Sequence, residues 1–242
     1  MNEARPAFYA LAPGGWRDYL TLLHPPYTLW HLSYVVIGAA LAPEWRPARL
    51  GWTLLAFGLA LGIGAHALDE LQGRPLATRI PAAVLWLLAV ASVGGAVAIG
   101  VAAALAWTLW LLPLVAFGGL VVFAYNLELL GGRLHSDLWF ALAWGSFPLL
   151  TAYVAAAERL RAEAVAAAAF AALTSLAQRA LSTPVRTLRR RVASVSGTVV
   201  FQDGSTEPVT RDSLAAAPET ALRLLSAAMP SLALALVLLR LT

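Results

Sequence analysis

Long apolar runs separated by short polar loops make up most of this chain. A bilayer core about 30 Å thick needs roughly 20 apolar residues per spanning helix, and seven runs approach or exceed that length. The first run is short and carries His31, and the sixth is rich in alanine and only mildly hydrophobic. The pattern predicts an all-α integral membrane protein, a helical bundle of about seven transmembrane helices. The predicted spans are residues 27–41, 50–67, 80–99, 101–125, 137–156, 164–181 and 221–241.

Two further segments are predicted outside these spans. Residues 16–23 have the pattern of a short amphipathic helix at the membrane interface. Residues 198–202 and 205–210 alternate around Asp203–Gly204, which predicts a β-hairpin with a type I′ turn. A two-stranded hairpin is marginal alone, so we expect it to pack on the membrane domain, either as a connector or as a lid over a site. The predicted parts are an interfacial segment 1–26, helices one to six in 27–181, a basic cytoplasmic insertion 182–219 containing the hairpin, and a last helix 220–242.

Composition supports a membrane protein. Hydrophobic residues make up 60% of the 242 residues and charged residues 12%, with a mean hydropathy of +0.72. Soluble domains carry about a quarter charged residues, so an ordinary soluble enzyme and a disordered chain are both excluded. The absence of cysteine excludes disulfides and thiolate chemistry. The basic residues are all arginine and lie in loops between apolar runs, so the net charge of +4 does not indicate a nucleic-acid partner.

The arginines also predict the orientation of the chain. They concentrate near the N-terminus, in the loops after the second and fourth runs, and in segment 182–219. Loops rich in arginine and lysine stay on the cytoplasmic side of a membrane. We therefore expect a multi-pass protein of a bacterial-type cell (inner) membrane, with its N-terminus in the cytoplasm and its C-terminus outside.

Ionisable residues gather at the ends of the spans that this orientation places in the cytoplasm. Such residues are costly near a bilayer and are candidates for a functional site. At the end of the second span, His66, Asp69 and Glu70 have i,i+3 and i,i+4 spacings, which predicts one helix face that binds a metal ion and carries catalysis. Arg74 and Arg79 follow in a proline-containing loop, where they would bind a phosphate or carboxylate. The alternative is an ordinary helix end with a histidine–carboxylate hydrogen bond inside it.

A second cluster joins the fourth and fifth spans. Glu128 and His135 are candidates to complete the metal coordination begun at His66. Asp137 suits the N-terminal cap of the fifth helix better than a metal site. His31 needs a polar partner inside the first span, which either a metal or a hydrogen bond to another helix would supply. His24, which precedes two prolines, is expected at the membrane interface.

The order of these features resembles the UbiA superfamily of membrane prenyltransferases. Asp69 followed by Gly73-Arg74-Pro75 is similar to the first aspartate-rich motif of that family, and residues 125–128 and 142–148 are similar to its mid-protein signature. Gln178-Arg179 and the stretch to Arg186 stand where the second motif would be. The resemblance implies a helical bundle in which magnesium ions bridge the diphosphate of a polyprenyl donor. It also implies that the substrate is bound by Tyr125, Asn126, Arg179 and Arg186.

The sequence departs from this family in its number of spans, because seven are predicted where the family typically has nine, and in both aspartate-rich motifs. His66 stands inside the first motif, and the second motif has no aspartate. Histidine ligands move a metal site from magnesium toward iron, zinc or manganese. We expect a divalent-metal-dependent prenyltransferase that acts on an isoprenoid diphosphate or a related membrane lipid. The alternatives are a protein of this fold with a transition-metal site for redox or hydrolytic chemistry, and a non-catalytic protein that binds a lipid or quinone.

Overall fold

The computed structural model describes residues 5–242, so the first four residues of the predicted segment 1–26 lie outside the described residues. The chain is almost entirely helical, as the apolar runs predict. Two of the long helices consist of α-helical parts joined by a π-helical segment. The elements are α1 (Trp16–Leu22), α2 (Pro25–Leu41), α3 (Pro47–Phe57), η1 (Gly58–Ala65), α4 (His66–Leu71), α5 (Ala82–Ala106), α6 (Leu111–Asn126), α7 (Asp137–Phe140), η2 (Ala141–Ser146), α8 (Phe147–Ala157), α9 (Ala162–Arg190), β1 (Thr198–Val200), β2 (Thr206–Pro208) and α10 (Arg211–Leu241).

Within residues 5–242, five helices are long and apolar enough to cross a membrane, which makes the chain a multi-pass membrane protein. They are Pro47–Leu71, Ala82–Ala106, Asp137–Ala157, Ala162–Arg190 and Arg211–Leu241. The helices α2 and α6, with 17 and 16 residues, are shorter. The prediction of an all-α membrane protein is thereby confirmed at the level of class.

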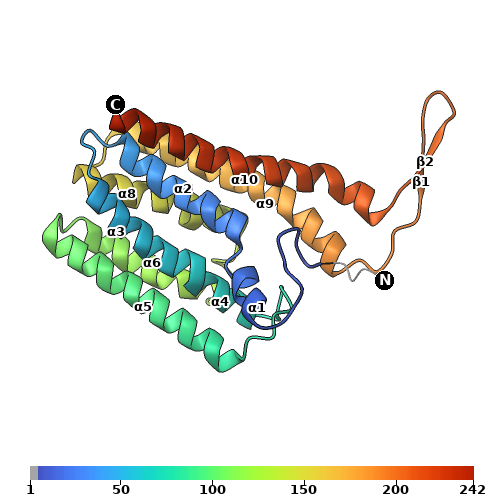
Figure 1. Cartoon of the computed structure of the whole chain (residues 1–242), viewed down its shortest axis with the longest axis horizontal. Helices are drawn as coiled ribbons and strands as arrows, with labels where there is room; N and C mark the ends of the chain where they lie inside the picture. The colour runs from blue at the N-terminus through green and yellow to red at the C-terminus, as the bar shows by residue number, and fades with distance from the viewer. Residues whose placement is uncertain (1–4) are drawn as a thin grey trace.

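The long helices lie side by side with their axes roughly aligned (Figure 1). Helix α10 packs along α2 and α9 on one side of the bundle, while α5 packs on η1 and α6 on the other. Helix α1 and the loop between α4 and α5 gather at one end of the bundle, near the C-terminal end of α9 (Figure 1). The C-terminus lies at the opposite end. Segments that are distant in the sequence therefore lie near one another at this end of the bundle.

The boundary between the third and fourth predicted spans is wrong. Helix α5 runs through Gly100 to Ala106, and α6 begins only at Leu111. A Cβ atom on Gly100 would lie 2.5 Å from Val115 Cγ2, so this glycine allows α5 and α6 to approach closely. Gly118 also lies at a close contact, because a Cβ atom there would lie 2.9 Å from the ring of Phe147, whereas Gly94 faces open space. The turn between α5 and α6, residues 107–110, contains no glycine.

The hairpin exists, but its turn and its surroundings differ from the prediction. Strands β1 and β2 are antiparallel, with Val200 opposite Thr206. Gly204 has a φ of 83°, and its amide donates to the carbonyl of Phe201, so the loop has three residues rather than the two of a type I′ turn. Every residue of both strands is exposed, and the hairpin projects away from the bundle (Figure 1). It therefore does not pack on the membrane domain.

Candidate functional site

A cavity of about 300 Å³ lies at the end of the bundle where α1 and the C-terminal part of α9 meet. Its walls come from the N-terminal segment, α2, α4, α6, the α6–α7 loop, the α7–η2 region and α9. We call this cavity the charged pocket. Its charged and titratable lining residues are Asp69, Arg179, Arg186, Arg190, His24, His31, His66, His135, Tyr9, Tyr27 and Tyr125.

Three of the four histidines are held in the same way. The Nδ1 atoms of His31, His66 and His135 lie 2.9–3.1 Å from the carbonyl oxygens of Trp144, Gly62 and Tyr125. A carbonyl oxygen only accepts hydrogen bonds, so Nδ1 is the donor in each ring. In the neutral form, Nε2 then keeps its lone pair for a ligand or a proton. The hydrogen bond of His31 joins α2 to η2, and a hydrogen bond to another helix was one of the two expected roles of this residue.

The π-helical segments supply two of these acceptors. Gly62 belongs to η1 and Trp144 to η2. A π-helical segment changes the regular α-helical bonding pattern and is frequent at functional sites. In this structure, each segment places a carbonyl oxygen beside a histidine that faces the charged pocket.

His24 lies inside the charged pocket, which corrects its expected interfacial position. Its Nδ1 atom is 3.0 Å from the hydroxyl of Tyr9, and its ring stacks on that of His66 with centroids 4.0 Å apart. The Nε2 atom is buried without a hydrogen-bond partner among residues 5–242. Burial, together with the neighbouring His66 and two arginines, lowers the pKa of His24 well below its ordinary value. The residue also has a φ of 44°, a conformation that is uncommon for a side chain of this size.

The three arginines of the charged pocket differ in their partners. Arg179 forms an ion pair with Asp137 at 2.8 Å and donates to the hydroxyl of Tyr125. Arg186 donates to the hydroxyl of Thr183, and Arg190 donates to the carbonyl of Pro6. Within residues 5–242, neither Arg186 nor Arg190 forms an ion pair with a carboxylate. Two guanidinium groups of the described chain therefore face the cavity without an ion pair.

Asp69 and Glu70 are neighbours in the sequence but have different environments. Asp69 lines the charged pocket and forms no ion pair within the described chain, although the charges of Arg186 and Arg190 act on it. Glu70 is 1% exposed and accepts three hydrogen bonds of 2.8–3.0 Å from Leu76 and Thr78. Its carboxylate closes the loop after α4 and does not line the cavity. This corrects the expectation that His66, Asp69 and Glu70 share one functional face.

Several other predicted site residues lie outside the charged pocket. Arg74 donates to the carbonyl of Ile80, and Arg79 is exposed. Glu128 is exposed, with its carboxylate 4.0 Å from His135. Asn126 lines the pocket, but its side-chain amide donates to the carbonyl of Val122 in its own helix. The N-terminal cap of α7 is Ser136 rather than the adjacent Asp137, which pairs with Arg179.

The donors in the charged pocket do not match the pair of magnesium ions that the family resemblance implies. Asp69 is the single carboxylate among the lining residues, and magnesium prefers oxygen ligands. In the described part of the chain, no group of three or more histidine and carboxylate side chains is placed to hold a metal. The prediction of a bound divalent ion therefore stays a prediction.

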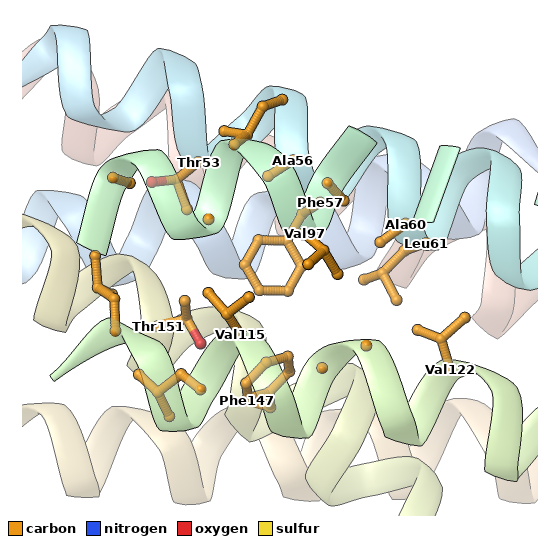
Figure 2. Close-up of a pocket in the computed structure, with 18 of the residues that line it drawn as sticks. Thr53, Ala56, Phe57, Ala60, Leu61, Val97, Val115, Val122, Phe147 and Thr151 are labelled. Carbon is orange, nitrogen blue, oxygen red and sulfur yellow. The ribbon is translucent and has the colours of Figure 1, made fainter. Parts of the chain in front are cut away.

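An apolar cavity of about 90 Å³ lies farther along the bundle. Its walls come from the α3–η1 helix, α5, α6 and the η2–α8 helix. Figure 2 shows the rings of Phe57 and Phe147 beside it together with the aliphatic side chains of Val97 and Val115. Trp144 lines both this cavity and the charged pocket, so a polar compartment and an apolar compartment share one wall.

Several polar pocket residues besides His24 were not among the predicted site residues. Tyr9 and Tyr27 come from the N-terminal segment and α2, Gln178 lies next to Arg179, and Arg190 ends α9. The sequence does indicate Gln178 as a site residue, because Gln178 and Arg179 lie where the second family motif would be. Nothing local in the sequence indicates that Tyr9 reaches His24, since that contact depends on how the N-terminal segment folds back.

Comparisons of the chain with protein-family models, with curated proteins and with solved structures return no match. The resemblance to the UbiA superfamily therefore rests on the quoted sequence motifs alone.

Proposed function

We propose that this chain is a membrane-embedded enzyme of prenyltransferase type, related in fold to the UbiA superfamily, that acts on an isoprenoid diphosphate or a related lipid. The observation that carries the proposal is the adjacency of the two cavities. An arginine-rich charged pocket suits a phosphorylated head, and the apolar cavity that shares Trp144 with it suits a hydrocarbon chain. An isoprenoid diphosphate has both features in one molecule.

The membrane setting supports this class of substrate. In the described part of the chain, five helices are long and apolar enough to cross a bilayer. The helices α2 and α6, at 1.5 Å per residue, reach about 25 Å and, in the proposal, complete seven crossings. An odd number of crossings places the two termini on opposite sides, with the N-terminus and the charged pocket on the cytoplasmic side, as the arginine distribution predicts.

The aromatic lining favours a reaction through an allylic cation. Tyr125 and Trp144 have ring centroids 4.4 Å apart, and Phe140 stacks on Trp144 at 5.8 Å. Aromatic faces attract cations because of their negative π surface. In the proposed reaction, the bond between the prenyl C1 atom and the bridging oxygen breaks, and the electron pair leaves with the diphosphate. A nucleophilic atom of the acceptor then forms a bond to C1.

The chain also has groups that can take the proton released by the acceptor. His31 and His66 present an unprotonated Nε2 atom when neutral, because Nδ1 is the hydrogen-bond donor in both rings. A base held in a fixed tautomer has the lone pair already oriented. We assign proton acceptance to this pair and the binding of the leaving diphosphate to the arginines. Each assigned role thus belongs to a side chain that lines the charged pocket.

The test is turnover of a prenyl diphosphate by the full chain purified in mild detergent, with and without added magnesium. We expect release of diphosphate and formation of a prenylated product with an added phenolic or lipid acceptor. Asp69→Asn and His66→Gln should each reduce the rate at least tenfold, because both side chains line the charged pocket. Glu207→Gln, an exposed substitution in the hairpin, is the matched control that should leave the rate unchanged.

Two outcomes would redirect the proposal. Tight binding of the prenyl diphosphate without turnover, with any acceptor tested, would support the non-catalytic lipid-binding alternative. Co-purification of stoichiometric iron, zinc or manganese that is lost in His66→Gln would support the transition-metal alternative. Failure to bind or convert any prenyl diphosphate would overturn the proposed function.

A further inference from the structure

We propose that the charged pocket binds the phosphate groups of its ligand directly through Arg186 and Arg190, without a bridging metal ion, and that Gln178 provides an additional hydrogen-bonding group. This inference rests on the proposed function, because it names the way in which the same pocket recognises its ligand. It departs from what the family resemblance implies, which is recognition through magnesium ions held by carboxylates.

The arginines carry the first part of the argument. Arg186 and Arg190 lie one helical turn apart near the end of α9, and both line the charged pocket. Neither forms an ion pair within residues 5–242, whereas Arg179 beside them is paired with Asp137. Guanidinium groups bind phosphate oxygens in a two-pronged geometry, and such charge-assisted hydrogen bonds are among the strongest in proteins. A phosphorylated ligand would pair with two guanidinium groups that form no ion pair within residues 5–242.

Gln178 provides an independent observation. Its side chain is 4% exposed and lines the charged pocket, and its Oε1 atom is buried without a hydrogen-bond partner in the described chain. A buried polar group without a partner costs free energy, so native proteins rarely keep one without a reason. The side-chain amide can both donate and accept, and a phosphate that carries a proton offers complementary groups. The Nε2 atom of His24, also buried and unpartnered, is the second such group in the pocket.

The charge balance of the pocket agrees with an anionic ligand. The lining residues include three arginines and one aspartate, so the pocket has a net charge of +2 when its histidines are neutral. Asp137, which does not line the pocket, pairs with Arg179. The remaining charged lining residues are then Arg186, Arg190 and Asp69. A diphosphate bound on the arginine side needs no second carboxylate cluster. The absence of aspartate from the second motif is then compatible with binding, because arginines occupy that part of the chain.

The experiment measures binding by the full chain in detergent, with EDTA present and then with magnesium in excess. The probes are farnesyl diphosphate, inorganic diphosphate and farnesol, which separate the head from the tail. We expect farnesyl diphosphate to bind in EDTA, with an affinity that magnesium changes less than about threefold. Arg186→Gln should weaken this binding at least tenfold, and Arg186→Lys should weaken it less, because lysine keeps the charge but not the two-pronged geometry. Gln178→Met, which keeps the length but not the amide, should weaken it about threefold to tenfold.

The matched control is Arg133→Gln, which removes the same charge from an exposed position in the α6–α7 loop. It should leave the affinity unchanged, and thermal unfolding of every variant shows whether the fold is retained. Binding that appears only with magnesium would overturn the inference and leave the proposed function standing. Binding of farnesol as tight as that of farnesyl diphosphate, or no binding of either, would overturn both. Inorganic diphosphate bound as tightly as farnesyl diphosphate would support the arginine site and count against a prenyl substrate.

Discussion

The two ends of the helical bundle treat their charged side chains in opposite ways. At one end, the loops that follow α2 and α8 and the first turn of α3 bring Arg46, Arg49, Glu44 and Glu158 together, and we call these four residues the loop cluster. Arg46 contacts Glu44 at 2.7 Å and Glu158 at 2.6 Å, and Arg49 contacts Glu158 at 2.8 Å. At the other end, Arg186, Arg190 and Asp69 line the charged pocket without an ion pair in the described chain.

Under the proposed function, this difference separates charges that stabilise the fold from charges that bind a ligand. In the loop cluster, each charge has its partner within the protein, so the network is complete. The charged pocket contains unpaired charges and buried polar atoms without partners, including those of His24 and Gln178. Keeping such groups near a membrane is costly unless they have a function. Since both ends contain arginine and carboxylate residues, composition alone does not distinguish them.

The largest expected effect on stability concerns the adjacent residues Asp69 and Glu70. They show the same contrast, between a charge paired within the protein and one that is not, within a single helical turn. Glu70→Gln should lower the free energy of unfolding by about 2–4 kcal/mol, because the buried carboxylate accepts hydrogen bonds from Leu76 and Thr78. Asp69→Asn should change it by less than about 1 kcal/mol, because within residues 5–242 the Asp69 side chain accepts no such bonds. Unfolding in detergent, followed by circular dichroism, measures both. Equal destabilisation would show that the two carboxylates have the same structural role.

The next effect is a dependence of stability on pH below about 6.5, to which His24 contributes. Its folded pKa lies well below the unfolded value, because burial disfavours the charged form. The unfolded chain therefore binds a proton as the pH falls below about 6.5 while the folded chain does not, and stability decreases by up to about 1.4 kcal/mol per pH unit. Thermal unfolding between about pH 8 and pH 5 should show this slope, and His24→Gln should reduce it. A slope unchanged in the variant would mean that other groups cause it.

A smaller effect concerns Arg186 in the absence of ligand. Arg186→Gln should leave the thermal stability of the ligand-free protein unchanged or raise it by about 1 kcal/mol, because the substitution removes repulsion from Arg179 and Arg190. Arg49→Gln in the loop cluster should instead lower stability, since it removes a partner of Glu158. Thermal unfolding of the two variants side by side checks the contrast. A large loss of stability in Arg186→Gln would assign this arginine to the fold.

The smallest expected effect is the acid sensitivity of the loop cluster. Hydrogen bonds from Arg46 and Arg49 hold the pKa of Glu158 below its ordinary value of about 4.5. The folded pKa is below the unfolded one, so the contribution of Glu158 is fully present above the unfolded value and is lost as the pH falls through the folded value. Glu158→Gln should remove this small loss between about pH 5 and pH 3. High salt should weaken it in the wild type, because these side chains are exposed to solvent.

His24 and Glu158 show why a lowered pKa has two meanings. The pKa of His24 is lowered because burial, and then the neighbouring His66 and two arginines, disfavour the charged ring, so His24 is kept neutral. The pKa of Glu158 is lowered because two arginines stabilise the carboxylate, so Glu158 is kept charged. A phosphate bound beside His24 would favour its protonated form, and the stability of the liganded protein should then depend less on pH.

Much of the one-dimensional organisation could be predicted from the sequence. The apolar runs locate the long helices, because the length of hydrocarbon to be crossed fixes the length of each run. Helix α1 and the position of the hairpin follow from local patterns. The concentration of histidine, aspartate and arginine near one level of the bundle also follows from where these residues stand in the runs.

The tertiary structure decided which of these residues meet. Periodicity places His66, Asp69 and Glu70 near one helix face. Only the folded loop shows that its backbone amides donate hydrogen bonds to Glu70, while Asp69 lines the charged pocket. The contact between Tyr9 and His24 likewise requires the N-terminal segment to fold back over α2. Hydropathy specifies the depth of a residue along the bundle and not its neighbours around it. Neighbours are set by helix packing and by the loops, whose polar groups bind whichever partner the fold brings within reach.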